Sequence, residues 1–171
     1  GSTATLTMVN GIAVNLADKD YISIVGLRGS STETTDNHSG SFIAGNGASN
    51  TTITDIYATG SFSGSNNGGC VKLEHSNNNT VNYNFLRDCK HSGDGLIDNV
   101  SSIVMLDDEG VGEGAGHIKR FNSIWFSSYS NTGNSNAVFN KHGANAADIG
   151  SNGDKVEFNN IINARRVVFW S

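Results

Sequence analysis

The stretch Cys70-Val71-Lys72-Leu73-Glu74 alternates apolar and polar side chains, and five other segments of similar character occur along the chain. Alternation with a period of two is typical of a β-strand that buries one face. The six copies recur about every 30 residues, at 12–16, 41–45, 70–74, 95–99, 137–141 and 167–170. A second series follows at a shorter offset, at 22–25, 53–56, 81–85, 118–124 and 156–162. Two strand series in phase predict a chain that coils repeatedly onto itself.

The uneven spacing of the copies favours a solenoid over other repeat proteins. Periods of roughly 20 to 50 residues are typical of solenoids, propellers and arrays. No segment has helical apolar periodicity, which excludes leucine-rich, ankyrin and tetratricopeptide repeats. A propeller needs four strands per repeat at nearly constant length. We therefore predict an all-β fold, a parallel β-helix of about five or six rungs, formed by a single domain over residues 1–171.

The composition and the asparagine runs agree with a coil of strands. The chain is 36% hydrophobic and 16% charged and contains no proline, and both fractions lie below those of an average globular domain. Asparagine tolerates the left-handed backbone of sharp turns, and identical asparagines on successive rungs can form ladders. The runs 49–52 and 77–80 each precede a strand of the second series. We expect these runs at the corners of the coil.

The ends of the chain predict a larger assembly. Gly1-Ser2 resembles a cloning remnant, and no cap follows the last apolar segment, which stops at Ser171. Solenoids ordinarily cover their terminal coils. We therefore expect either a piece of a longer chain or a homo-oligomer, such as a trimer, in which another subunit covers the last coil.

The net charge of −5 argues against a nucleic-acid partner, which requires a basic surface. An acidic sugar polymer is not excluded, because local cations can offset the mean charge. No stretch of 18 apolar residues is present, so no membrane span is expected.

Cys70 and Cys89 could form a disulfide or be two small buried thiols. Because buried packing is the commoner role of cysteine, we expect thiols.

Alternation also indicates which side chains face solvent. If Val71 and Leu73 point inward, Lys72 and Glu74 point outward, and Val138 pointing inward would place Lys141 outside. The candidates for one functional patch along the stack are Lys72, Glu74, Asp98, Lys141 and His142.

The motif Asp94-Gly95-Leu96-Ile97-Asp98 resembles the calcium-binding segment of the extracellular pectate lyases, within the superfamily of right-handed parallel β-helices that includes polysaccharide lyases, hydrolases and phage tailspikes. The resemblance implies a right-handed coil, a secreted or virion-surface location and Ca²⁺ held by Asp94 and Asp98. Calcium takes six to eight oxygen ligands, and a turn followed by a strand can direct two carboxylates to one ion. Looser similarity extends over about half of the chain.

The first functional hypothesis is a lyase that cleaves an acidic polysaccharide by β-elimination. A base removes the proton α to a uronate carboxylate, and a cation stabilises the enolate-like charge that develops. We assign the base to Lys141, with Lys72 and His142 as further catalytic candidates, and substrate binding to Glu74, Asn140 and Arg120. A glycoside hydrolase that uses Glu74 and Asp98 is a variant within the same class.

The alternative is a glycan-binding or structural module, such as a tailspike, adhesin or fibre shaft. It is supported by the absence of the Asp-His pair and of the arginine-rich segment that pectate lyases carry. An ice-binding solenoid needs a regular threonine array, which this sequence lacks. A competing acidic cluster, at 107–109 with Glu113, precedes His117, Lys119 and Arg120 in a glycine-rich segment that we expect to be an exposed loop.

Overall fold

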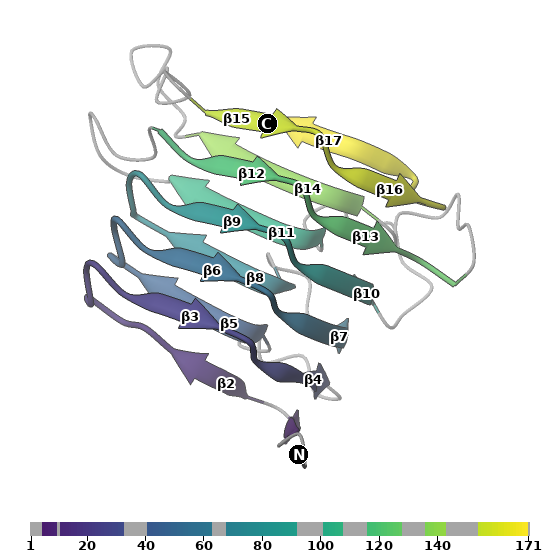
Figure 1. Cartoon of the computed structure of the whole chain (residues 1–171), viewed down its shortest axis with the longest axis horizontal. Coiled ribbons are helices and arrows are strands. Elements are labelled where there is room, and N and C mark those ends of the chain that lie inside the picture. Colours follow the sequence, from purple (N-terminus) through teal and green to yellow (C-terminus); the bar gives the residue numbers. More distant parts are fainter. Residues whose placement is uncertain are drawn as a thin grey trace.

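The protein is a coil of short β-strands (Figure 1). The computed structural model describes residues 5–9, 11–32, 41–62, 68–91, 101–107, 116–127, 136–142 and 154–170. These ranges contain seventeen strands and no helix, so the predicted all-β character is confirmed. Within them, accordingly, there is no helix with the length and apolar character required to cross a membrane.

The strands form three parallel sheets, which we name A, B and C. Sheet A contains β1 (Leu6–Val9), β4 (Arg28–Thr32), β7 (Tyr57–Phe62), β10 (Phe85–His91), β13 (Ser123–Trp125) and β16 (Asn160–Ile162). Sheet B contains β2 (Ile12–Asn15), β5 (Ser41–Asn46), β8 (Gly69–Glu74), β11 (Ser101–Asp107), β14 (Asn136–His142) and β17 (Arg166–Trp170). Sheet C contains β3 (Ser23–Val25), β6 (Thr52–Thr54), β9 (Thr80–Asn82), β12 (Ile118–Arg120) and β15 (Lys155–Glu157).

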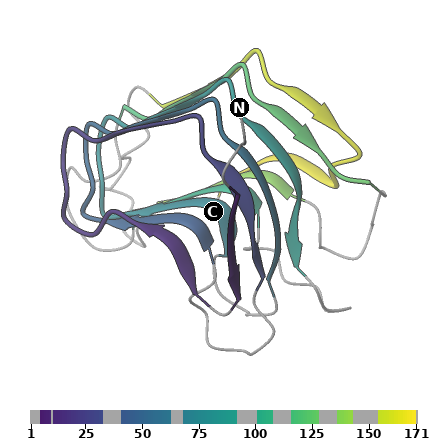
Figure 2. The same ribbon diagram turned by 60° about the horizontal axis from the view of Figure 1, so that its bottom comes forward.

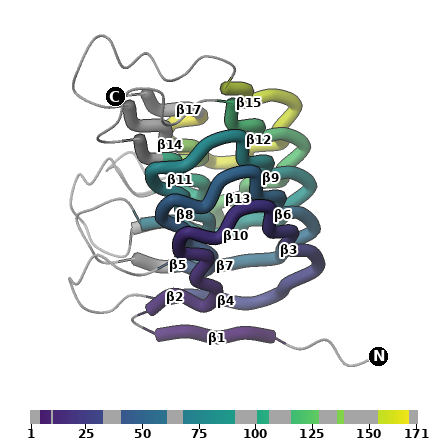
Figure 3. Tube along the Cα trace, turned by 90° about the vertical axis from the view of Figure 1, so that its left-hand side faces the viewer, coloured from purple at the N-terminus to yellow at the C-terminus, as the bar shows by residue number. Residues whose placement is uncertain are grey.

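Each turn of the coil runs through sheet B, then sheet C, then sheet A, and every strand pairs in parallel with its equivalents in the adjacent turns. The stacked turns are visible in Figure 3, and Figure 2 shows them lying one behind another. One register column of sheet B gives the length of each turn. Its consecutive members are 29, 28, 32, 35 and 30 residues apart, in the series Val14, Ile43, Val71, Ile103, Val138 and Val168. This arrangement is consistent with a parallel β-solenoid.

The strand of sheet B after β8 was predicted at 95–99, and this position was wrong. Residues 95–99 lie outside the described part of the structure, and the strand that pairs with β8 is β11, where Ile103 pairs with Val71. Ile103 and Met105 are buried, so this strand supplies the apolar interior of its turn. The repeat is therefore more even than the sequence spacing predicted.

The second series of predicted strands divides into two sheets. The segment 118–124, predicted as one strand, consists of β12 and β13, with Phe121 and Asn122 between them. Phe121 has a left-handed backbone (φ 55°), which turns the chain from sheet C into sheet A. Left-handed conformations are uncommon for bulky residues, so nothing in the local sequence pointed to this corner.

Asparagines stack inside this corner in three successive turns. Asn122 Oδ1 accepts hydrogen bonds from Asn84 N (3.1 Å) and Asn84 Nδ2 (2.9 Å). Asn122 in turn donates from Nδ2 to Asn159 Oδ1 (3.0 Å) and to the Val81 carbonyl (2.9 Å). The predicted asparagine ladder thus exists at other residues, whereas the runs 49–52 and 77–80 lie at the corner between sheets B and C, as predicted.

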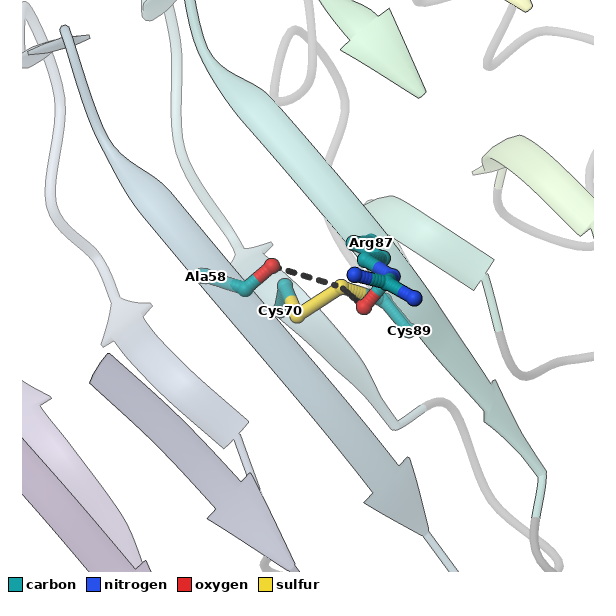
Figure 4. The surroundings of a disulfide bond; sticks show 4 residues. All are labelled: Ala58, Cys70, Arg87 and Cys89. Carbon is teal, nitrogen blue, oxygen red and sulfur yellow. Dashed lines mark hydrogen bonds between the residues drawn. A yellow bond between two sulfur atoms is a disulfide. The ribbon is translucent and has the colours of Figure 1, made fainter. Parts of the chain in front are cut away.

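A disulfide joins Cys70 and Cys89, so the expectation of two buried thiols was wrong. Cys70 lies on β8 of sheet B and Cys89 on β10 of sheet A, and the bond crosses the interior of one turn (Figure 4). The Cα atoms are 5.6 Å apart, a separation that suits a disulfide. Cys89 Sγ also lies 3.8 Å from the Ala58 carbonyl oxygen, a packing contact because a disulfide sulfur carries no hydrogen.

Reduction of this disulfide is expected to lower the free energy of unfolding by about 3 kcal/mol, because the bond restricts the unfolded chain over a sequence separation of 19 residues. Urea denaturation of the oxidised and reduced protein measures the difference. The double variant Cys70→Ala/Cys89→Ala is the control, since its unfolding midpoint must not respond to the reductant. Equal midpoints for oxidised and reduced wild type would contradict the prediction.

Candidate functional site

The outer face of sheet B carries two of the predicted site residues, Lys72 and Glu74. Val71 and Leu73 are fully buried while Lys72 and Glu74 are partly exposed, which confirms the predicted alternation on β8. Lys72 Nζ lies 3.0 Å from Glu74 Oε1. The pair lines a groove of about 320 Å³ together with Ile12, Asn15, Ala17, Ser41, Ala44, Gly45 and Asn46.

Three further predicted residues, Asn140, Lys141 and His142, lie on β14 of the same sheet. Lys141 pairs with Leu106, which pairs with Glu74, so Lys141 and Glu74 share one register column with one strand between them. The side chains of residues 139–142 lie outside the described part of the structure. Their assignment to catalysis and substrate binding stays a prediction.

The predicted calcium ligands, Asp94 and Asp98, lie outside the described residues, as do Glu109 and Glu113 of the competing acidic cluster. Among the residues that the structure does describe, no group of three or more His, Cys, Asp or Glu side chains could hold a metal ion. The calcium site therefore stays a prediction.

Arg120 does not lie on the face that carries Lys72 and Glu74. It belongs to β12 of sheet C, where its guanidinium lies 5.6 Å from the centre of the Phe121 ring. His117 and Lys119, expected in an exposed loop, are both buried. Lys119 Nζ lies 2.9 Å from Asp154 Oδ2, and Asp154 Oδ1 also accepts a hydrogen bond from the backbone N–H of His117.

Sheet A carries an outward aromatic row that the sequence reasoning missed. Tyr57 and Phe85 are register partners on β7 and β10, with stacked rings whose centres are 5.2 Å apart. Phe85 and Trp125 meet edge to face at 6.5 Å. All three side chains are half-buried. The residues that follow Tyr57 and Phe85 in the sequence, Ala58 and Leu86, have fully buried side chains.

Cationic side chains flank the aromatic row. The Arg28 guanidinium lies 6.0 Å from the centre of the Tyr57 ring, and that of Arg87 lies 4.6 Å from the centre of the Trp125 ring. Such contacts hold a guanidinium in place and leave N–H groups for further hydrogen bonds. The outer face of sheet A therefore combines fixed cations with apolar ring edges.

Two grooves lie side by side on this face and share Thr59. The first has a volume of about 330 Å³ and is lined by Thr5, Arg28, Gly29, Ser30, Tyr57 and Thr59. The second has a volume of about 350 Å³ and is lined by Thr32, Thr59, Gly60, Arg87, Asp88 and Lys90. Hydroxyl, guanidinium and ammonium groups thus line a shallow path across the strands.

Asp88 is the carboxylate on the described strands of sheet A. Its Oδ1 accepts hydrogen bonds from Ser127 N (2.7 Å) and Ser127 Oγ (2.8 Å), and its Oδ2 lies 3.4 Å from Arg87 Nε. Burial raises the pKa of Asp88, but the Ser127 hydrogen bonds and the charges of Lys90 and Arg87 outweigh it and lower the pKa below its ordinary value. Asp88 therefore stays ionised at neutral pH.

A sequence signal for the aromatic row does exist. Tyr57 follows the left-handed corner residue Asp55 by two positions, and Phe85 follows the left-handed Tyr83 by the same two positions. Equivalent positions in successive turns stack on one another, so Tyr57 and Phe85, at one distance from their corners, are neighbours. Trp125 follows the left-handed Phe121 by four positions, so this signal does not include it. The signal was unusable without the positions of the corners.

Comparisons of the chain with protein families, with curated proteins and with solved structures found no match.

Proposed function

We propose that this protein binds polysaccharides and that the outer face of sheet A is its binding surface. The pair of grooves that meet at Thr59 carries the proposal. They extend from Thr5, just before β1, to Lys90 on β10. The three spacings between the adjacent strands β1, β4, β7 and β10 give this path a length of about 14 Å. A path of that length suits several sugar units of a polymer rather than one ring.

The chemistry of the face supports a sugar ligand. Hydroxyls from Ser30 and Thr59 line the grooves beside the guanidinium groups of Arg28 and Arg87. Charged donors make stronger hydrogen bonds than neutral ones, and the ring of Tyr57 supplies an apolar surface for the C–H groups of a sugar.

Binding without cleavage is the form of the proposal that the described face favours. Glycosidases use two carboxyl groups that flank the scissile bond. On the described strands of sheet A, Asp88 is the single carboxylate, and Ser127 and Arg87 contact its oxygens.

The fold and the location are proposed with the function. We take the coil to be right-handed, because connections between parallel strands are right-handed in about 98% of cases. The Cys70–Cys89 disulfide supports an extracellular or virion-surface location, since disulfides persist in oxidising compartments.

A lyase on sheet B is the second candidate. Its support is the register column in which Leu106 of β11 pairs with both Lys141 and Glu74. Strand β11 directly follows the segment 92–100, which contains Asp94 and Asp98. As the ammonium of an ion pair with Glu74, Lys72 would have to give up a proton before it could act as the base.

Thr59→Glu is expected to weaken polysaccharide binding at least about tenfold, because it places a larger, charged side chain where the two grooves meet. Affinity electrophoresis in gels that contain uronate, sulfated or neutral polymers measures the effect. Thr54→Glu is the matched control, since Thr54 is a similarly exposed threonine of the same turn but on sheet C.

Three results would contradict the proposal: no retardation of the wild type by any polymer, equal loss in the two variants, or unchanged binding by Thr59→Glu. Melting temperatures of both variants show whether they are folded. An unsaturated product, followed by its absorbance with and without calcium, would favour the lyase on sheet B instead.

A further inference from the structure

Strand β10 contains a bulge at the groove that Arg87 and Lys90 line. Arg87 pairs with Thr59 and Lys90 pairs with Ser61, so β10 advances three residues while β7 advances two. Asp88 within the bulge has a left-handed backbone (φ 51°). Bulges bend a strand and redirect the side chains that follow them, often beside functional sites.

The bulge changes which residues of β10 face outward. Leu86 and Cys89 are both fully buried although three positions separate them, whereas strict alternation would place them on opposite faces. The same shift leaves Arg87, Asp88 and Lys90 on the groove side. The bond from Cys89 to Cys70 fixes this arrangement from inside the coil.

The groove at the bulge is a local exception to the negative charge of the protein. Arg87 and Lys90 contribute two positive charges and Asp88 one negative charge, so the groove has a net charge of +1, against −5 for the whole chain. The Asp88 carboxylate is bound by Ser127 and Arg87.

We infer that this groove binds the acidic substituent of a polysaccharide, a carboxylate or a sulfate ester. The inference rests on the proposed function and adds the class of sugar. Arg87 and Lys90 donate charge-assisted hydrogen bonds to the oxyanion, and the Thr59 hydroxyl lies in the same groove. The neighbouring groove, at Arg28, Ser30 and Tyr57, takes the adjacent sugar units of the same chain.

Lys90→Gln tests the inference, because it removes one positive charge and leaves the Arg87 contacts with Trp125 and Asp88 in place. Binding is measured on polygalacturonate, which carries carboxylates, on dextran sulfate, and on neutral dextran. We expect about tenfold weaker binding of one or both acidic polymers and unchanged binding of dextran, with a smaller dependence on salt concentration. The polymer that loses affinity identifies the acidic group.

Two variants serve as controls. Lys90→Arg keeps the charge and is expected to retain most of the affinity. Lys155→Gln removes an exposed lysine from sheet C and is expected to change nothing. Equal loss for Lys90→Gln and Lys155→Gln would assign the effect to overall charge and overturn the inference.

The inference and the proposed function fail in different ways. If Thr59→Glu abolishes binding but Lys90→Gln leaves the affinities for acidic and neutral polymers unchanged, sheet A binds glycans and the acidic subsite is wrong. If Thr59→Glu has no effect, or the wild type binds no polymer, both are wrong.

Discussion

Asp154→Asn is expected to lower the free energy of unfolding by about 3–5 kcal/mol, because it removes the carboxylate charge next to a buried ammonium. Lys119 Nζ and Asp154 Oδ2 are 2.9 Å apart, and their side chains are 0% and 1% exposed. Asparagine retains an oxygen for the hydrogen bond from His117 N, so the change acts mainly on the charge. Urea denaturation followed by tryptophan fluorescence measures the loss.

The double variant Lys119→Met/Asp154→Asn is expected to recover most of that loss. Lys119 occupies a column of sheet C in which its register partners are Val81 and Val156, so an apolar side chain of similar length suits the position. Lys119→Met alone is expected to be as harmful as Asp154→Asn, since it leaves the carboxylate buried without its ammonium. Additive losses in the double variant, or single losses below about 1 kcal/mol, would contradict this account of the pair.

Asn122→Ala is expected to cost about 4 kcal/mol, because Asn122 joins three turns of the coil. The substitution removes the acceptor of Asn84 N and the donor to the Val81 carbonyl, and both groups lie inside the corner. A buried backbone group that loses its hydrogen bond costs about 1–3 kcal/mol. The side-chain hydrogen bond to Asn159 Oδ1 is lost as well, while the backbone N–H of residue 122 still donates to the same oxygen.

Asn160→Ala is the matched control for the ladder. Asn160 is exposed, although it directly follows the ladder residue Asn159. The control is expected to change the free energy of unfolding by less than about 0.5 kcal/mol. Equal effects of the two substitutions in urea denaturation would show that the ladder contributes little to stability.

The strands could be predicted because alternation is a local property. Val71 and Leu73 are buried and Lys72 and Glu74 are partly exposed, as a period of two requires. The corner at Phe121 was missed because its left-handed backbone is stabilised by the neighbouring turns, through the stacking of Phe121 on Tyr83 and Phe158. That stabilisation involves residues about 40 positions away in the sequence.

The grooves of sheet A contain none of the residues that the sequence predicted for the site. The positions of Lys72 and Glu74 follow from β8 alone, but the grooves of sheet A combine residues from Thr5 to Lys90. Lys119 was misplaced because a lysine ordinarily lies at the surface, and its burial depends on Asp154, 35 residues further along the chain. The disulfide was missed for a similar reason, since the bulge in β10 turns Cys89 toward Cys70.

The pairing of each strand with its equivalents in adjacent turns determines how the protein unfolds locally. Hydrogen bonds and register pairs connect a turn to the turns before and after it, as β8 pairs with β5 and β11. In such a one-dimensional stack, cooperativity is limited to nearest neighbours, and separate segments can unfold at different free energies. The disulfide closes a covalent ring within a single turn. It stabilises the other turns only through the strand pairs and the asparagine ladder that connect them to this turn. A substitution that breaks the ladder at one corner would therefore divide the coil into the turns before it and the turns after it, and each group would keep its own strand pairs.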